Sequence, residues 1–167
     1  PDILEMCSNI VLVQTSATLS DERYVSKQES ALKYERVLRQ ALDVLSFTLL
    51  DSLSDIPLLY ESKLWKLMAL EPVAKNVLTL ATKVVKRDSV LDDLVEKQLN
   101  KALQKPIPSA SVELVRALLV YQKNGQKVSL SALAGYLKGA ALFPKPFWPL
   151  FFNLAILVGF ESPLKEA

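Results

Sequence analysis

The side chains that most often perform acid–base and metal chemistry are scarce in this sequence. It contains no histidine and only one cysteine, Cys7. Histidine is the side chain whose unperturbed pKa lies nearest to neutral pH, and it is also the commonest metal ligand. One cysteine cannot form an internal disulfide or a zinc site built from several thiolates. The composition therefore argues against an enzyme that uses the usual general base and against a zinc site of that kind.

Acidic side chains could still bind a metal ion or transfer a proton, and one group to consider is Asp92, Asp93 and Glu96. Their spacing places them on adjacent turns at the start of a predicted helix. Acidic residues are favoured there because the free backbone N–H groups make a helix N-terminus partly positive. No histidine accompanies them. We therefore expect no catalytic residue, no metal ion and no cofactor, and we interpret the chain as non-enzymatic.

Basic side chains form a second candidate group. Lys97, Lys101 and Lys105 follow one another at intervals of four residues, which places them on one face of a helix, and Lys127 is added to them as a fourth candidate. Such a face could bind the phosphates of a nucleic acid. The alternative is a solvated surface near a helix C-terminus, where positive charge offsets the helix dipole.

Aromatic side chains are concentrated in residues 146–160, a stretch without a charged residue. A membrane-spanning helix needs about 20 apolar residues, and Pro149 interrupts this shorter segment, so we do not expect it to cross a membrane. Two interpretations remain open: a helix buried in the core, or a surface that docks a partner. Large aromatic rings are preferred anchors at protein interfaces. The predicted partner-binding residues are Phe143, Phe147, Trp148 and Phe151.

Apolar residues at helical spacing predict six or seven helices from Ser26 onward, and the chain has no convincing pair of strands. Residues 3–13 favour a helix, although the apolar run 10–13 would also suit a buried strand, and the polar residues 14–25 predict a loop. Ser26 and Glu29 have the spacing of a capping box, which begins a long helix. Further helices are predicted over residues 58–68, 72–85, 91–103, 112–124, 130–138 and 147–159. Prolines within residues 105–109 predict a linker between two of them.

Residues 112–137 combine a helix, a turn at Asn124-Gly125-Gln126 and a second helix that begins after Ser129. This order resembles the first two helices of a winged-helix or helix-turn-helix domain. In that family the next helix is the recognition helix, which carries polar and basic residues into a groove of DNA. Here the next helix is the aromatic segment, and its nearby charge is Lys145. The resemblance therefore implies a degenerate module that binds protein.

These patterns together predict an all-α fold, either a six- to seven-helix bundle or a short helical-repeat array, with a degenerate winged-helix-like C-terminal third. Its parts are an N-terminal apolar segment and loop (1–25), a helical bundle (26–105) and a C-terminal helical subdomain (109–167), which together form one folded unit. A lone cysteine is typical of a reducing compartment, so we expect the cytoplasm or the nucleus. The predicted function is a scaffold or adaptor domain that binds protein within a multiprotein complex. The alternative is a helical module that binds nucleic acid through its basic face.

Overall fold

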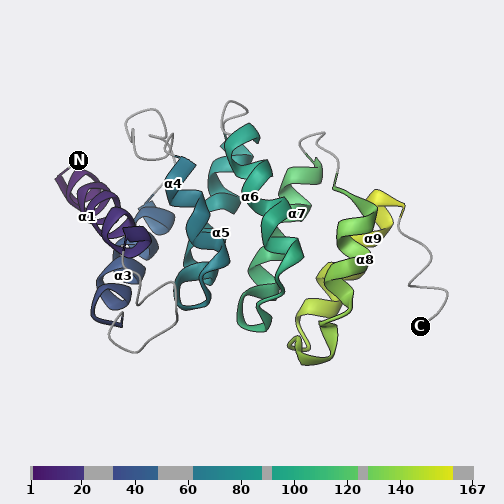
Figure 1. Ribbon diagram of the computed structural model, residues 1–167. Coiled ribbons are helices and arrows are strands. Elements are labelled where there is room, and N and C mark those ends of the chain that lie inside the picture. Colours follow the sequence, from purple (N-terminus) through teal and green to yellow (C-terminus); the bar gives the residue numbers. More distant parts are fainter. Residues whose placement is uncertain (1, 21–31, 49–61, 88–91, 124–127, 160–167) are drawn as a thin grey trace.

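A computed structural model describes residues 2–20, 32–48, 62–87, 92–123 and 128–159 (Figure 1). These ranges contain helices and no strand, which confirms the all-α prediction. The α-helices are α1 (Asp2–Ser20), α3 (Leu32–Thr48), α4 (Ser62–Trp65), α5 (Glu71–Arg87), α6 (Asp92–Gln104), α7 (Ser111–Lys123), α8 (Leu130–Leu137) and α9 (Phe147–Val158). Short 3-10 turns occur at η4 (Lys66–Ala69), η6 (Pro108–Ala110) and η7 (Ala140–Leu142).

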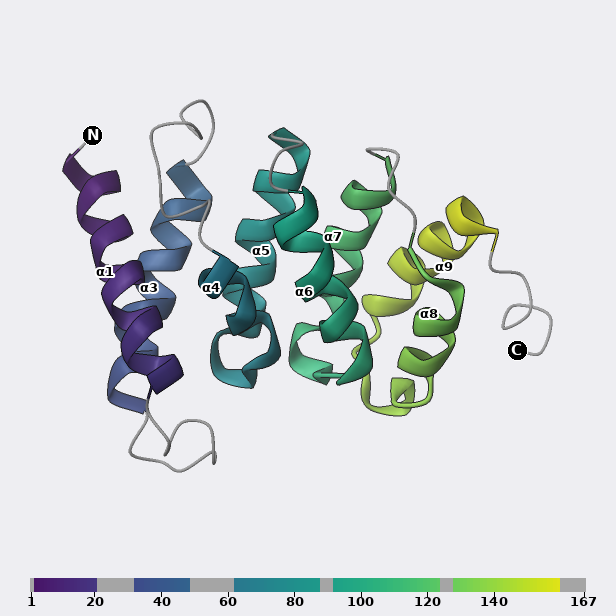
Figure 2. The ribbon, with the colours of Figure 1, turned by 45° about the horizontal axis from the view of Figure 1, so that its top comes forward.

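The helices alternate between two rows that run the length of the molecule (Figure 2). In the first row α4 packs against α1 and α6, and α6 packs against α8. In the second row α3 packs on α5, α5 on α7, and α7 on α9. The result is an open array with α1 at one end and α8 and α9 at the other (Figures 1 and 2). Of the two predicted architectures, the structure has the array.

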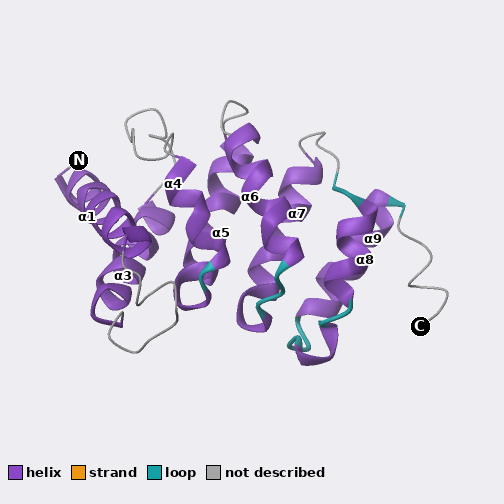
Figure 3. Ribbon diagram, in the orientation of Figure 1, coloured by secondary structure: helices purple, strands orange, loops and turns teal. Residues whose placement is uncertain are grey.

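Local sequence rules explain several helix boundaries (Figure 3). Ser129 caps α8 as predicted, because its hydroxyl accepts a hydrogen bond from the backbone N–H of Ala132 at 3.3 Å. The next α-helix, α9, ends at Gly159, whose φ of +71° is a left-handed conformation that glycine adopts without strain. The predicted capping box at Ser26 and Glu29 lies outside the described residues.

The first helix is longer than the sequence predicts. It continues through the polar residues 14–20, where we expected a loop. Its buried side consists of side chains three or four residues apart, which places them on one face toward α3. They are Cys7, Val11, Thr15 and Thr18. Packing against α3 therefore extends the helix through residues whose polarity alone is typical of a loop.

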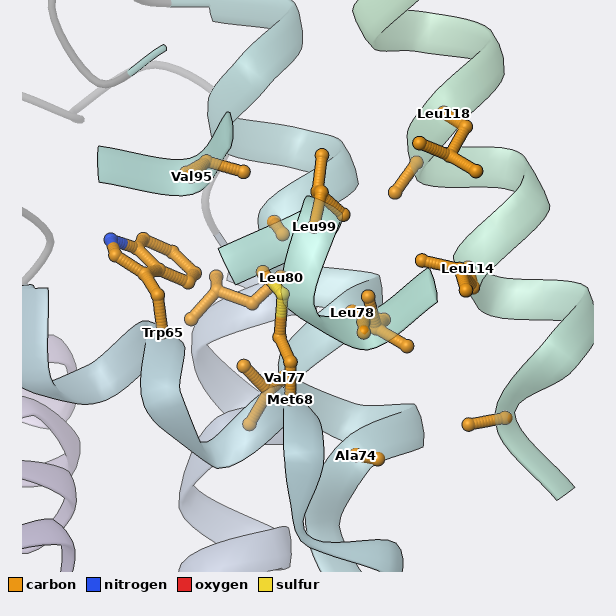
Figure 4. Packing of buried hydrophobic residues seen from close by; sticks show 14 of the residues in the cluster. Trp65, Met68, Ala74, Val77, Leu78, Leu80, Val95, Leu99, Leu114 and Leu118 are labelled. Carbon is orange, nitrogen blue, oxygen red and sulfur yellow. The ribbon is translucent and has the colours of Figure 1, made fainter. Parts of the chain in front are cut away.

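One continuous cluster of buried side chains runs from Cys7 in α1 to Ala155 in α9. At its centre α5 is buried on several sides, and Figure 4 shows Val77 and Leu80 of this helix close to Trp65 and Leu99 of the first row. Full burial of such a side chain contributes about 1.5–3 kcal/mol to folding. The cluster crosses the linker predicted at 105–109, where α6 ends and η6 leads into α7.

The predicted winged-helix resemblance is limited to local order. A helix, a turn and a capped helix do follow one another over 112–137, but α8 packs mainly against α6, and α9 packs mainly against α7. In a helix-turn-helix domain the consecutive helices pack on each other. The C-terminal helices thus continue the two rows instead of forming a separate three-helix unit.

Replacing Leu80 by alanine should lower the free energy of unfolding by about 2–5 kcal/mol, because it leaves a cavity in the core between the rows. Leu130 provides a matched control, since it is an exposed leucine near the start of α8. Leu130→Ala should change the same quantity by less than about 0.5 kcal/mol. Urea unfolding followed by circular dichroism measures both, and equal losses would contradict this assignment of the core.

Candidate protein-interaction surface

A chain of aromatic rings connects α8 to α9. The ring centroid of Phe143 lies 4.9 Å from that of Tyr136 and 4.7 Å from that of Phe147. On α9, Phe147 stacks on Phe151 with the centroids 5.5 Å apart. Pairs at such separations contribute about 0.5–1.5 kcal/mol beyond the area that they bury. The rings therefore hold the connection after α8 and the last helix against each other.

This packing places three of the four predicted partner-binding residues in the core. Phe143, Phe147 and Phe151 are buried, whereas Trp148 is half-buried with its ring centroid 5.0 Å from that of Phe147. A buried ring has no accessible surface to offer a partner in this conformation. The partner-binding role of the four residues stays a prediction, and Trp148 is the member of the group that reaches the surface.

The opposite side of α9 is apolar and exposed. Phe152, Ile156 and Leu157 are 40%, 72% and 49% exposed, and the centroid of the Phe152 ring lies 6.3 Å from that of Trp148. We call Trp148, Phe152, Ile156 and Leu157 the outer face of α9. The helix itself carries no charged residue.

Ile156 and Leu157 were not among the residues predicted from the sequence. A signal for Ile156 was present, because residues 148, 152 and 156 are four apart and so share one side of a helix. The inner side follows the same rule with Phe147, Phe151 and Ala155. Which of the two stripes is buried depends on where α7 and α8 lie, and hydropathy does not distinguish them because both are apolar.

The predicted basic stripe lies on α6 and at its C-terminal end, in the first row. Lys97, Lys101 and Lys105 are all exposed, as their spacing predicts, and none forms an ion pair with another described residue. Lys127 lies outside the described residues. The stripe is on a different helix from the outer face of α9, so variants can separate the two surfaces. Nucleic-acid binding by these lysines stays a prediction.

Among the described residues, Tyr136 is the titratable group that burial perturbs most clearly. Burial of its side chain raises the pKa of the phenol well above its ordinary value, and the nearby Glu113 carboxylate raises it further. The hydroxyl has no hydrogen-bond partner among the described residues. The ring therefore packs as a neutral group with Phe143 and Phe147.

In the described part of the chain, no group of three or more Cys, Asp or Glu side chains is placed to hold a metal ion. The start of α6 at Asp92 agrees with the interpretation of its acidic residues as a helix-start preference. None of the described helices has the length and apolar character needed to cross a membrane.

A scan against protein-family models matches residues 1–154 to the N-terminal domain of the E3 ubiquitin-protein ligase listerin. The chain belongs to this family. Searches of the curated proteins and of the solved structures find no match. The family match includes both rows of the array and ends inside α9, so Ile156 and Leu157 of the outer face lie beyond it.

The two sides of α9 in this listerin-family domain should respond differently to truncation. Phe151→Ala should lower the free energy of unfolding by about 3–5 kcal/mol, because the ring is buried among other rings. Phe152→Ala, its neighbour on the outer face, should cost less than about 1 kcal/mol. Urea unfolding of both variants measures this, and a larger loss for Phe152 would reverse the assignment of the two sides.

The raised pKa of Tyr136 predicts a pH dependence of stability. The folded protein retains the phenol proton at pH values where the unfolded chain, with an ordinary pKa of about 10, releases it. The contribution of Tyr136 to the free energy of unfolding is therefore fully present below about pH 10, and it declines above that pH by up to about 1.4 kcal/mol per pH unit. The variant Tyr136→Phe has no phenol to titrate, so it should lack the part of the decline in stability that is due to Tyr136. Urea unfolding at a series of pH values from 8 to 11 tests this, and identical profiles for wild type and variant would contradict it.

Proposed function

We propose that this listerin-family domain is a non-enzymatic scaffold or adaptor that holds a protein partner within an intracellular ubiquitin-ligase complex. The observation that carries the proposal is the outer face of α9, where an uncharged helix at the end of the array exposes large apolar side chains. Membership in a family described as a ubiquitin ligase supports a setting among other proteins. A sequence without histidine supports the non-enzymatic part.

The occupant that best fits this face is a helical segment of a partner protein. Along the second row, α5 packs between α3 and α7, and α7 packs between α5 and α9. A partner helix beside α9 would take the next position in this row, with its own apolar stripe against Phe152, Ile156 and Leu157. An amphipathic helix on an apolar surface is a recurring mode of recognition.

The free energy gained by burial, compared with the cost of association, indicates how large the contact with a partner must be. Burying one large apolar side chain contributes about 1.5–3 kcal/mol before the cost of association is subtracted. Association itself costs at least about 4 kcal/mol in lost freedom of movement. The outer face of α9 therefore provides the central anchors, and a stable complex requires further contacts around them.

The test is the double variant Phe152→Ser with Ile156→Ser, compared with Lys97→Glu combined with Lys101→Glu as a matched surface control. Both should keep the circular dichroism and thermal midpoint of the wild type within a few degrees, because all four residues are exposed. Affinity capture should give a stoichiometric protein that the α9 variant loses and the lysine variant keeps. Recombination of the purified pair should reproduce the loss, by at least about tenfold in affinity.

Two results would overturn the proposal. Binding that disappears with nuclease or high salt, and with the lysine variant but not the α9 variant, would favour the nucleic-acid alternative, since contacts to phosphate weaken steeply with salt. Hydrogen exchange that shows the outer face of α9 protected within the isolated full-length protein would assign the face to intramolecular packing instead of a partner.

A further inference from the structure

Helices α3 and α5 are neighbours in the second row (Figure 2). Side chains of these two helices line a polar cleft. It has a volume of about 480 Å³, within the range of pockets that hold small ligands. Its lining residues are Arg36, Arg39, Gln40, Asp43, Lys75, Asn76 and Thr79. None of them belongs to the outer face of α9 or to the lysines of α6.

The side chains that line the cleft carry more positive than negative charge. Arg39 pairs with Glu35 one turn away, at 3.4 Å. Asp43 accepts a hydrogen bond from the amide of Asn76 at 2.7 Å, which joins the two helices across the cleft. Arg36 and Lys75 are exposed and form no ion pair or hydrogen bond through their side chains with another described residue. Two cations that have no charged partner among the described residues therefore line the cleft, Arg36 from α3 and Lys75 from α5.

The neutral side chains of the cleft favour a peptide over a nucleic acid. Gln40 and Asn76 carry amides, which both donate and accept hydrogen bonds and so can pair with the N–H and C=O groups of an extended backbone. The hydrogen bond to Asp43 holds Asn76 in place, and its carbonyl oxygen and second N–H have no partner among the described residues. The lining residues include no aromatic ring on which a base could stack.

We propose that this cleft binds an extended acidic peptide segment. Carboxylates of the peptide pair with Arg36 on α3 and with Lys75 on α5, while the amides of Gln40 and Asn76 hydrogen-bond its backbone. Charge-assisted hydrogen bonds of this kind are stronger than neutral ones, and arginine can hold a carboxylate through two of them. The site uses other residues than the outer face of α9, so either surface can bind whether or not the other does.

The experiment measures fluorescence anisotropy of a fluorescein-labelled peptide with four Glu-Ser repeats, with four Gln-Ser repeats as the uncharged control. The acidic peptide should bind and the control should not. Arg36→Glu with Lys75→Glu should weaken binding by at least about tenfold, because two attractive contacts become repulsive. Arg36→Lys with Lys75→Arg should retain most of it. The matched control Lys97→Glu with Lys101→Glu should leave the affinity unchanged within about twofold.

Nuclear magnetic resonance provides a second measurement that does not depend on the variants. Titration of the acidic peptide into the isotope-labelled protein should shift the side-chain amide signals of Gln40 and Asn76 and leave those of α9 in place. The proposal is overturned if the peptide does not bind, if the α6 variant weakens it as much as the cleft variant, or if the amide signals do not move. It is also overturned if single-stranded oligouridylate displaces the peptide and binds more tightly, which would assign the cleft to nucleic acid.

Discussion

The packing of α5 between α3 and α7 is the contact on which the rest of the array depends. Helix α5 also packs against η4 of the first row. Trp65 of α4 and Met68 of η4 are buried in the same cluster. The apolar side chains Val77 and Leu80 of α5 have no accessible surface, so neither row can separate from the other without exposing them. Because each remaining helix packs mainly on its neighbours, the stability of such an array is close to a sum of neighbouring interfaces.

An open array leaves two ends, and both are apolar here. At one end α1 exposes Ile3, Met6 and Val13, and at the other the outer face of α9 includes Phe152 and Ile156. The interior helices bury comparable side chains against the next helix in their row. The helices stack along one axis, so the last helix at each end of the array has no neighbour to cover its apolar side chains. Charged residues lie on the surfaces parallel to that axis, as Arg36, Lys75 and Lys97 do.

Local rules predicted the elements of this fold well and their arrangement poorly. The all-α class, the start of α8 at Ser129 and the break near Pro106 and Pro108 follow from periodicity, capping and proline chemistry. Which helices pack together is set by tertiary contacts, and the sequence has no evident repeat to indicate them. The clearest example is the contact between Asp43 and Asn76, which are 33 residues apart, so the cleft between α3 and α5 has no local signature.

The side of α1 that packs on the array includes polar groups that weaken its attachment. Two of its inward residues, Thr15 and Thr18, have hydroxyls without a hydrogen-bond partner in the described part of the chain, and each such group costs about 1–3 kcal/mol. Among the described elements, α1 packs mainly on α3 and α4. Detachment of α1 therefore leaves the core around α5 intact. Detachment of α1 should therefore be a separate cooperative step, in which the N-terminal helix exchanges with solvent while the remaining rows stay folded.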